Sequence, residues 1–211
     1  MRIIIFDFDN CLVPGNAVGE NVLHPLFTLL ENNENHLSAE QFAEMKADFW
    51  RKPLDYIAEK FKFSEKSTQA GLAYFRQLEA KGSIKGYADS QLVNTMPGTK
   101  YVVTSGFEKF QRSKIAAAGL RDAFKDVFYD DPGEPPRKGK AFYFDIVART
   151  ENVSPEDIWV IGDSAESEIA AGNSLGMRTV QILRPGITKS DNARYHVTSL
   201  TEFQELMEHN A

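Results

Sequence analysis

The sequence predicts an α/β fold in which a Rossmann-like parallel sheet of about five strands is flanked by helices, with a helical bundle inserted after the first strand. Two observations support this prediction. Short runs of large apolar residues, typical of strands buried on both faces, alternate with helical patterns from about residue 86 onward. Before residue 86, apolar residues recur only at helical spacing. A chain of 211 residues has room for one such domain and a sizeable insert.

The first predicted strand is the apolar run of residues 2–6, and two carboxylates, Asp7 and Asp9, follow it directly. Side chains two positions apart in an extended chain project to the same side. The two carboxylates should therefore lie together at the carboxyl end of a buried strand, where open α/β sheets bind ligands. Adjacent carboxylates repel each other unless a cation or a shared proton relieves the repulsion. The pair therefore indicates a divalent metal site with a nucleophile or an acid/base group.

The Asp-x-Asp pattern by itself has other interpretations. It occurs in solvated turns, and sugar-nucleotide transferases use it to bind Mn²⁺. It also opens calcium-binding loops, but here Leu12 stands where such a loop needs Gly and Val18 stands where it needs Glu. The position directly after a fully apolar strand favours a catalytic role.

A bundle of about four helices is predicted from about Pro14 to Lys85, because this stretch shows none of the alternation of a strand. Capping residues divide the bundle, and we expect helices over residues 21–30, from Ser38 to about residue 50, from Pro53 to residue 61, and from Ser64 to about residue 82. The expected domains are therefore a core of residues 1–13 and 86–211 and a separate lid of residues 14–85.

The remainder of the chain alternates between strands and helices. Strands are expected over residues 100–104, 126–129, 158–161 and 178–183, and helices over residues 107–118, 140–150, 169–175 and 200–208. This alternation implies right-handed crossovers and a parallel sheet.

Residues with complementary chemistry stand at the carboxyl ends of these strands, which meet at one rim of a parallel sheet. Carboxylates hold Mg²⁺, while a hydroxyl, a helix N-terminus and a lysine neutralise phosphoryl oxygens. Phosphoryl transfer needs this combination. The set comprises Asp7 and Asp9, Thr104 and Ser105, Lys138 or Lys140, and Asp163 with Glu168.

The order and spacing of these residues resemble the four motifs of the haloacid dehalogenase superfamily. The resemblance covers the whole chain, because residues 14–85 resemble the helical cap inserted after strand 1 in the first cap class of that family. It implies that Asp7 is a nucleophile that forms an aspartyl-phosphate and that Asp9 protonates the leaving alcohol and then activates water. It also implies that Asp7, Asp163 and the backbone carbonyl of Asp9 bind Mg²⁺.

The same resemblance implies that Thr104 binds phosphoryl oxygens, with the neighbouring Ser105 as an alternative. It assigns the same role to Lys138, because the distance from Lys138 to the following helix fits the family spacing better than that of Lys140. Two positions depart from the family pattern. Cys11 stands where Thr is usual, and Glu168 stands where Asp is common. Because Glu168 is one methylene longer, contact with the metal through a water molecule is an alternative to direct contact.

The function implied by the resemblance is that of a Mg²⁺-dependent phosphatase acting on a small phosphorylated metabolite. In family members that dehalogenate, the position of Asp9 is typically not aspartate, so Asp9 indicates phosphate esters. A sugar phosphomutase shares all four motifs and stays an alternative, as does a non-catalytic phosphate-binding member. A phosphorylated receiver domain carries its carboxylates, Thr and Lys in another order and has no lid.

Composition limits the partners and the compartment. A net charge of −6 without a long basic stripe argues against a nucleic-acid partner. The single cysteine excludes an internal disulfide, so a reducing compartment, the cytoplasm, is expected. No apolar run approaches the length of a membrane span, and residues 2–6 are too short for a signal peptide. A monomer and a homodimer both fit the sequence.

Overall fold

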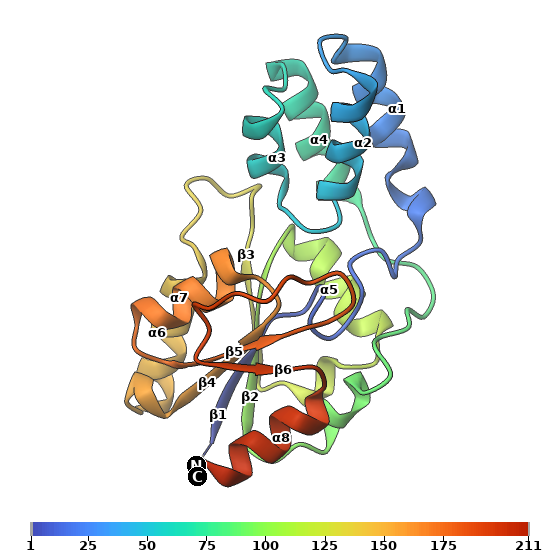
Figure 1. Ribbon diagram of the computed structural model, residues 1–211. Helices are drawn as coiled ribbons and strands as arrows, with labels where there is room; N and C mark the ends of the chain where they lie inside the picture. Colours follow the sequence, from blue (N-terminus) through green and yellow to red (C-terminus); the bar gives the residue numbers. More distant parts are fainter. Residues whose placement is uncertain (1, 211) are drawn as a thin grey trace.

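A computed structural model describes residues 2–210 of the chain. Its centre is a six-stranded sheet with the order β3-β2-β1-β4-β5-β6, in which every neighbouring pair is parallel (Figure 1). The predicted α/β class and the parallel sheet are confirmed. The strands are β1 (Ile3–Phe6), β2 (Thr99–Ser105), β3 (Asp126–Asp130), β4 (Ile158–Gly162), β5 (Arg178–Ile182) and β6 (Tyr195–Val197).

The sheet has one strand more than the sequence predicts. β6 is only three residues long and pairs with β5 at the edge of the sheet. Tyr195 and His196 are half-buried, and only Val197 is buried. This segment therefore lacks the run of apolar residues by which a strand buried on both faces is recognised.

The two faces of the sheet carry separate apolar layers, because alternate residues of a strand project to opposite faces. Ile4 and Phe6 of β1 belong to one cluster, and Ile3 and Ile5 belong to the other. β1 pairs with both β2 and β4 and is completely buried. The residues that follow β1 therefore emerge at the middle of the carboxyl edge of the sheet.

Helices from the second part of the chain cover both faces. Ile115 of α5 (Glu108–Ala117) and Phe203 of α8 (Leu200–His209) pack in the cluster of Ile4 and Phe6. On the other face, Phe144 of α6 (Lys140–Glu151) packs in the cluster of Ile3 and Ile5, beside α7 (Ala170–Ser174). The helices thus form one layer on each side of the sheet.

The inserted helices form a separate bundle beyond the carboxyl edge of the sheet, at the top of Figure 1. They enclose an apolar cluster of their own. Two core side chains join this cluster, Phe107 and Phe110, at the start of α5. The helices are α1 (His24–Asn33), α2 (Ala39–Asp48), α3 (Leu54–Lys60) and α4 (Glu65–Gln77).

The capping predicted for the bundle is present. The Ser38 side chain accepts a hydrogen bond from the backbone N–H of Gln41, and the Ser64 side chain accepts one from Ser67. Two predicted boundaries are wrong. The first helix is preceded by a 3-10 turn (Glu20–Leu23), and α4 ends at Gln77 rather than near residue 82, because the backbone is already extended at Leu78.

Polar side chains connect the bundle to the core near the carboxyl edge. Lys52 Nζ lies 2.9 Å from Glu166 Oε2, and Arg137 Nη1 lies 3.0 Å from Asp55 Oδ2. Because all four side chains are at least partly exposed, each pair is expected to stabilise the contact only weakly.

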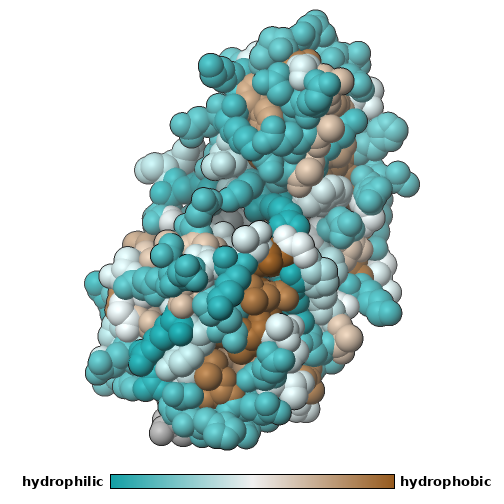
Figure 2. All heavy atoms as spheres, viewed as in Figure 1, coloured by the Kyte–Doolittle hydropathy of each residue, from teal (hydrophilic) through white to brown (hydrophobic). Residues whose placement is uncertain are grey.

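The face shown in Figure 2 is mostly hydrophilic, and its hydrophobic residues gather mainly over the sheet-containing part. Within residues 2–210, no helix combines the length and the apolar character needed to span a bilayer.

Candidate active site

A cavity of about 730 Å³ lies at the carboxyl edge of the sheet, between the core and the inserted bundle. The bundle contributes residues 49–56, which join α2 to α3 and form the first turn of α3, and Phe75 of α4. The core contributes every side chain that the sequence singled out: Asp7, Asp9, Thr104, Ser105, Lys138, Lys140, Asp163 and Glu168.

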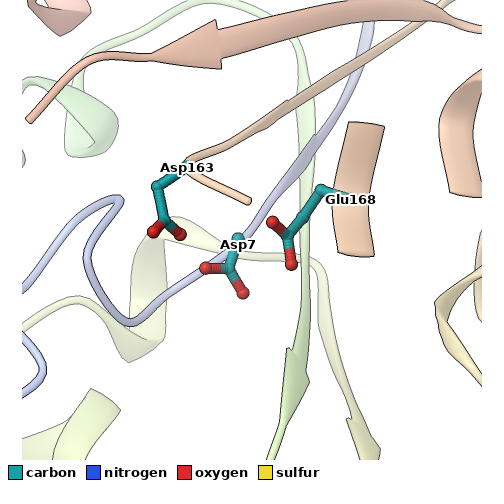
Figure 3. Close-up of side chains that lie close together, drawn as sticks. All are labelled: Asp7, Asp163 and Glu168. Atoms are coloured by element: carbon teal, nitrogen blue, oxygen red, sulfur yellow. The ribbon is translucent and has the colours of Figure 1, made fainter. Parts of the chain in front are cut away.

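Three carboxylates converge in this cavity (Figure 3). Asp7 follows β1, Asp163 follows the neighbouring β4, and Glu168 comes from a π-helical turn (Ala165–Ile169). One oxygen atom of each lies within 4.8 Å of the others. Oxygen ligands are those that Mg²⁺ prefers. This donor set therefore fits a divalent cation.

Close packing behind Glu168 turns this side chain toward the other two carboxylates. A Cβ atom at Gly162 would lie 2.5 Å from Cγ of Glu168, so the end of β4 requires glycine. The backbone N–H of Ser164 donates to Glu168 Oε2 at 3.1 Å. The sequence indicated a helix only from residue 169, and the π-helical turn before it is what brings Glu168 into the cluster.

Lys140 is the lysine that contacts the carboxylates. It is buried at the start of α6, its Nζ donates to Asp7 Oδ1 at 2.6 Å, and it also pairs with Glu168. Lys138 also lines the cavity, but its Nζ lies 4.6 Å from the centre of the Phe142 ring. The geometry therefore favours Lys140 over Lys138 as the partner of Asp7.

The three carboxylates and Lys140 together carry an excess of negative charge when all of them are ionised. Burial, followed by the charge of Glu168, raises the pKa of Asp163 to about 7. The same two causes raise the pKa of Asp7, although Lys140 acts in the opposite direction. Burial by itself lowers the pKa of Lys140, but the charges of Asp7 and Glu168 outweigh burial and raise it. One ammonium group thus faces three carboxylates, and a bound divalent cation would neutralise the remaining negative charge.

This imbalance predicts how the stability of the metal-free protein depends on pH. Asp163 ionises near 3.8 ordinarily but at about 7 in the folded protein. The contribution of protonated Asp163 to the stability of the fold is therefore complete below about pH 3.8 and is lost as the pH rises through about 7. We expect the unfolding temperature of the wild type, relative to Asp163→Asn, to fall between about pH 4 and pH 7. Mg²⁺ should reduce the fall, because it pairs with the ionised carboxylates. A difference that rises over this interval in thermal unfolding would contradict the charge balance.

The two hydroxyls after β2 have different surroundings. Thr104 is buried, and its Oγ1 accepts a hydrogen bond from Gln111 Nε2 at 2.8 Å. Ser105 is half-buried, and its Oγ accepts from Arg137 Nη2 at 3.1 Å. Both hydroxyl hydrogens are thus free to donate elsewhere, and both residues line the cavity.

Gln111, Lys114 and Arg137 are among the further polar residues that line the cavity, and the sequence pattern does not reveal them. Lys114 Nζ lies 2.7 Å from Asp9 Oδ1 and 2.6 Å from Asp9 Oδ2. Polar residues on an amphipathic helix ordinarily face water, so α5 carries no sequence signal for this contact.

Comparison with known proteins identifies relatives along most of the chain. The sequence model for haloacid dehalogenase-like hydrolases matches residues 1–176. Pyrimidine 5′-nucleotidase PynA from Streptococcus pneumoniae is 30% identical over 80 residues, which span 38% of this chain and 34% of that protein. Glyceraldehyde 3-phosphate phosphatase from Pyrococcus furiosus is 24% identical over an alignment of 230 positions, which spans 99% of this chain and 93% of that protein.

Solved structures share the fold. The haloacid dehalogenase-like hydrolase SP0104 from Streptococcus pneumoniae superposes with a TM-score of 0.73 at 14% identity, with 98% of each chain covered. L-2-haloacid dehalogenase from Xanthobacter autotrophicus superposes with a TM-score of 0.63 at 12% identity, with 100% of each chain covered. At these identities the likeness concerns the fold and does not distinguish between phosphate esters and halides as substrates.

Proposed function

The chain belongs to the haloacid dehalogenase-like hydrolases, and from this membership we propose that it is a Mg²⁺-dependent phosphatase acting on a small phosphorylated metabolite. The observation that carries the proposal is the convergence of Asp7, Asp163 and Glu168 on one point, with Lys140 beside them and Asp9 two residues after Asp7. The phosphatase from Pyrococcus furiosus, aligned over almost the whole chain, supports this choice.

Of the two aspartates after β1, Asp7 would act as the nucleophile and Asp9 as the general acid and base. An oxygen of Asp7 attacks phosphorus, and the bond from phosphorus to the ester oxygen breaks. Asp9 gives its proton to the departing alkoxide, which leaves as the alcohol. Asp9 then accepts a proton from a water molecule as that water attacks the phosphorus of the aspartyl-phosphate. Inorganic phosphate leaves, and both aspartates return to their starting states.

The surrounding residues would bind and orient the phosphoryl group. Asp7, Asp163 and Glu168 would hold Mg²⁺, which when bound neutralises charge on phosphoryl oxygens. Lys140 carries positive charge to the same place, and the Thr104 hydroxyl can donate to another oxygen. A halide leaves without a proton, so a proton donor at Asp9 fits an alcohol leaving group better than a halide.

We propose that residues 14–85 act as a lid over the core of residues 1–13 and 86–211. The segment between α2 and α3 lines the same cavity as Asp7, so a leaving group bound there would contact it. The pairs Lys52–Glu166 and Arg137–Asp55 join the lid to the core. Each partly exposed ion pair stabilises this contact by only about 0.2–1 kcal/mol, so breaking the two pairs would cost little when the lid opens.

A screen of phosphorylated metabolites tests the proposed function. The panel contains sugar phosphates, triose phosphates, nucleotides and an aryl phosphate, each with Mg²⁺ and with a chelator, and inorganic phosphate is measured. We expect release from at least the aryl phosphate with Mg²⁺, loss of release in chelator, and recovery when Mg²⁺ is restored. Full activity in chelator would refute the metal site. Conversion of a sugar phosphate to its isomer without phosphate release would identify a mutase instead.

A further inference from the structure

Two buried polar side chains of α5 bind the carboxylate of Asp9. Lys114 Nζ contacts both of its oxygen atoms, at 2.7 and 2.6 Å, and Gln111 Nε2 donates to Oδ2 at 2.8 Å. Gln111 and Lys114 are three positions apart on the helix, which places them on the same face. We call these two residues the α5 clamp.

Lys114 is an unusual residue for its environment. Its side chain is only 6% exposed, and its Nζ lies 4.9 Å from the centre of the Phe110 ring and 5.8 Å from that of Phe8. Burial of an ammonium is costly unless the charge is paired. Within residues 2–210, its ion-pair partner is Asp9. Because a buried ion pair is often no more stabilising than an apolar pair, packing alone does not account for a lysine here.

Gln111 connects Asp9 to the predicted phosphate-binding hydroxyl. Its Nε2 also donates to Thr104 Oγ1 at 2.8 Å. The hydroxyl hydrogen of Thr104 must then point away from Gln111 and is free to donate to a ligand. A Cβ atom at Gly106, where φ is +147°, would lie 2.8 Å from Gln111 Nε2. Glycine at this position therefore leaves space for the amide.

We infer that Gln111 and Lys114 are positioning residues for the two proton-transfer steps. The clamp holds the carboxyl group of Asp9 where it can reach the departing alkoxide, and Gln111 turns the Thr104 hydroxyl toward a phosphoryl oxygen. Lys114 itself exchanges no proton with the substrate. The inference rests on the proposed phosphatase function. Asp9 remains 23% exposed beside the cavity, so the clamp leaves it accessible to a leaving group.

The dependence of the rate on the leaving group tests this inference. Phenolate is a poor leaving group and needs a proton, whereas 4-nitrophenolate leaves without one. We expect Lys114→Met to lower kcat/KM for phenyl phosphate by about 10²-fold, the lower end of the range for acid–base catalysis, and to affect 4-nitrophenyl phosphate much less. Gln111→Met should likewise affect phenyl phosphate more than 4-nitrophenyl phosphate. In the double variant, the fold-decrease in kcat/KM for phenyl phosphate should be smaller than the product of the two single fold-decreases. Lys114→Arg, which keeps the charge, should recover part of the activity on phenyl phosphate.

Lys109→Met is the matched control, because Lys109 lies on the same helix but pairs with Glu79 at an exposed site. It should leave both substrates unchanged. An equal fall in kcat/KM for both esters in the clamp variants would mean that the clamp is only structural, and no fall would mean that Asp9 does not need it. Either result overturns the inference.

A crystal structure of the Lys114→Met protein, or of Gln111→Met if the first does not fold, tests the clamp without any activity. The Asp9 carboxylate should leave its wild-type rotamer. An unchanged rotamer would overturn the inference even if the wild-type protein hydrolysed none of the esters, an outcome that would separately refute the proposed function.

Discussion

Replacing Asp7 with Asn should abolish hydrolysis of every phosphate ester while the protein stays folded. An amide cannot attack phosphorus, and removal of the residues that act in covalent catalysis lowers kcat on the order of 10⁴–10⁶-fold. The fold should persist, because burial and Glu168 raise the pKa of Asp7, so a neutral side chain relieves repulsion in the metal-free protein. Steady-state kinetics and thermal unfolding measure the two effects.

Asp145→Asn is a suitable control for this substitution. Asp145 lies on α6 and forms an exposed ion pair with Arg149, away from the residues that line the cavity. It should change neither kcat nor the unfolding temperature appreciably. Substantial turnover by Asp7→Asn would show that another residue is the nucleophile.

Replacing Asp9 with Asn should lower turnover by about 10²–10⁴-fold, the range for general acid–base catalysis. An amide neither donates a proton to the alkoxide nor accepts one from water. The amide nitrogen would also face a donor, because Lys114 contacts both carboxylate oxygens of Asp9. The loss should be greatest for alkyl esters, whose leaving groups are the most basic. Undiminished hydrolysis of alkyl esters by this variant would exclude Asp9 as the proton donor.

Features that depend on a local pattern could be predicted from the sequence. Buried strands are recognised in the sequence as apolar runs, and the carboxyl ends of parallel strands lie at one edge of the sheet. These two facts suffice to bring Asp7 and Asp163 together. The four inserted helices were predictable from helical spacing and from caps such as Ser38, because both signals lie within a few residues of each other.

Features that depend on register or on tertiary packing could not be predicted in this way. Lys138 and Lys140 differ by two positions in an irregular segment, and only the actual start of α6 decides which of them reaches Asp7. Glu168 is brought inward by a π-helical turn that has no sequence pattern. The clamp residues Gln111 and Lys114 look like the solvated side of a helix until the helix is placed beside Asp9.

Peptide mapping of a trapped intermediate tests the central claim most directly. The Asp9→Asn protein is mixed with 4-nitrophenyl phosphate and Mg²⁺, quenched in acid within one turnover, digested, and analysed by mass spectrometry. Transfer to Asp7 needs no proton for this leaving group, whereas hydrolysis of the intermediate does need a base, so the phosphorylated enzyme should accumulate. We predict one phosphoryl group on the peptide that contains Asp7 and none in the Asp7→Asn protein. A phosphoryl group on any other residue, or release of 4-nitrophenol with no phosphorylated peptide, would contradict the account.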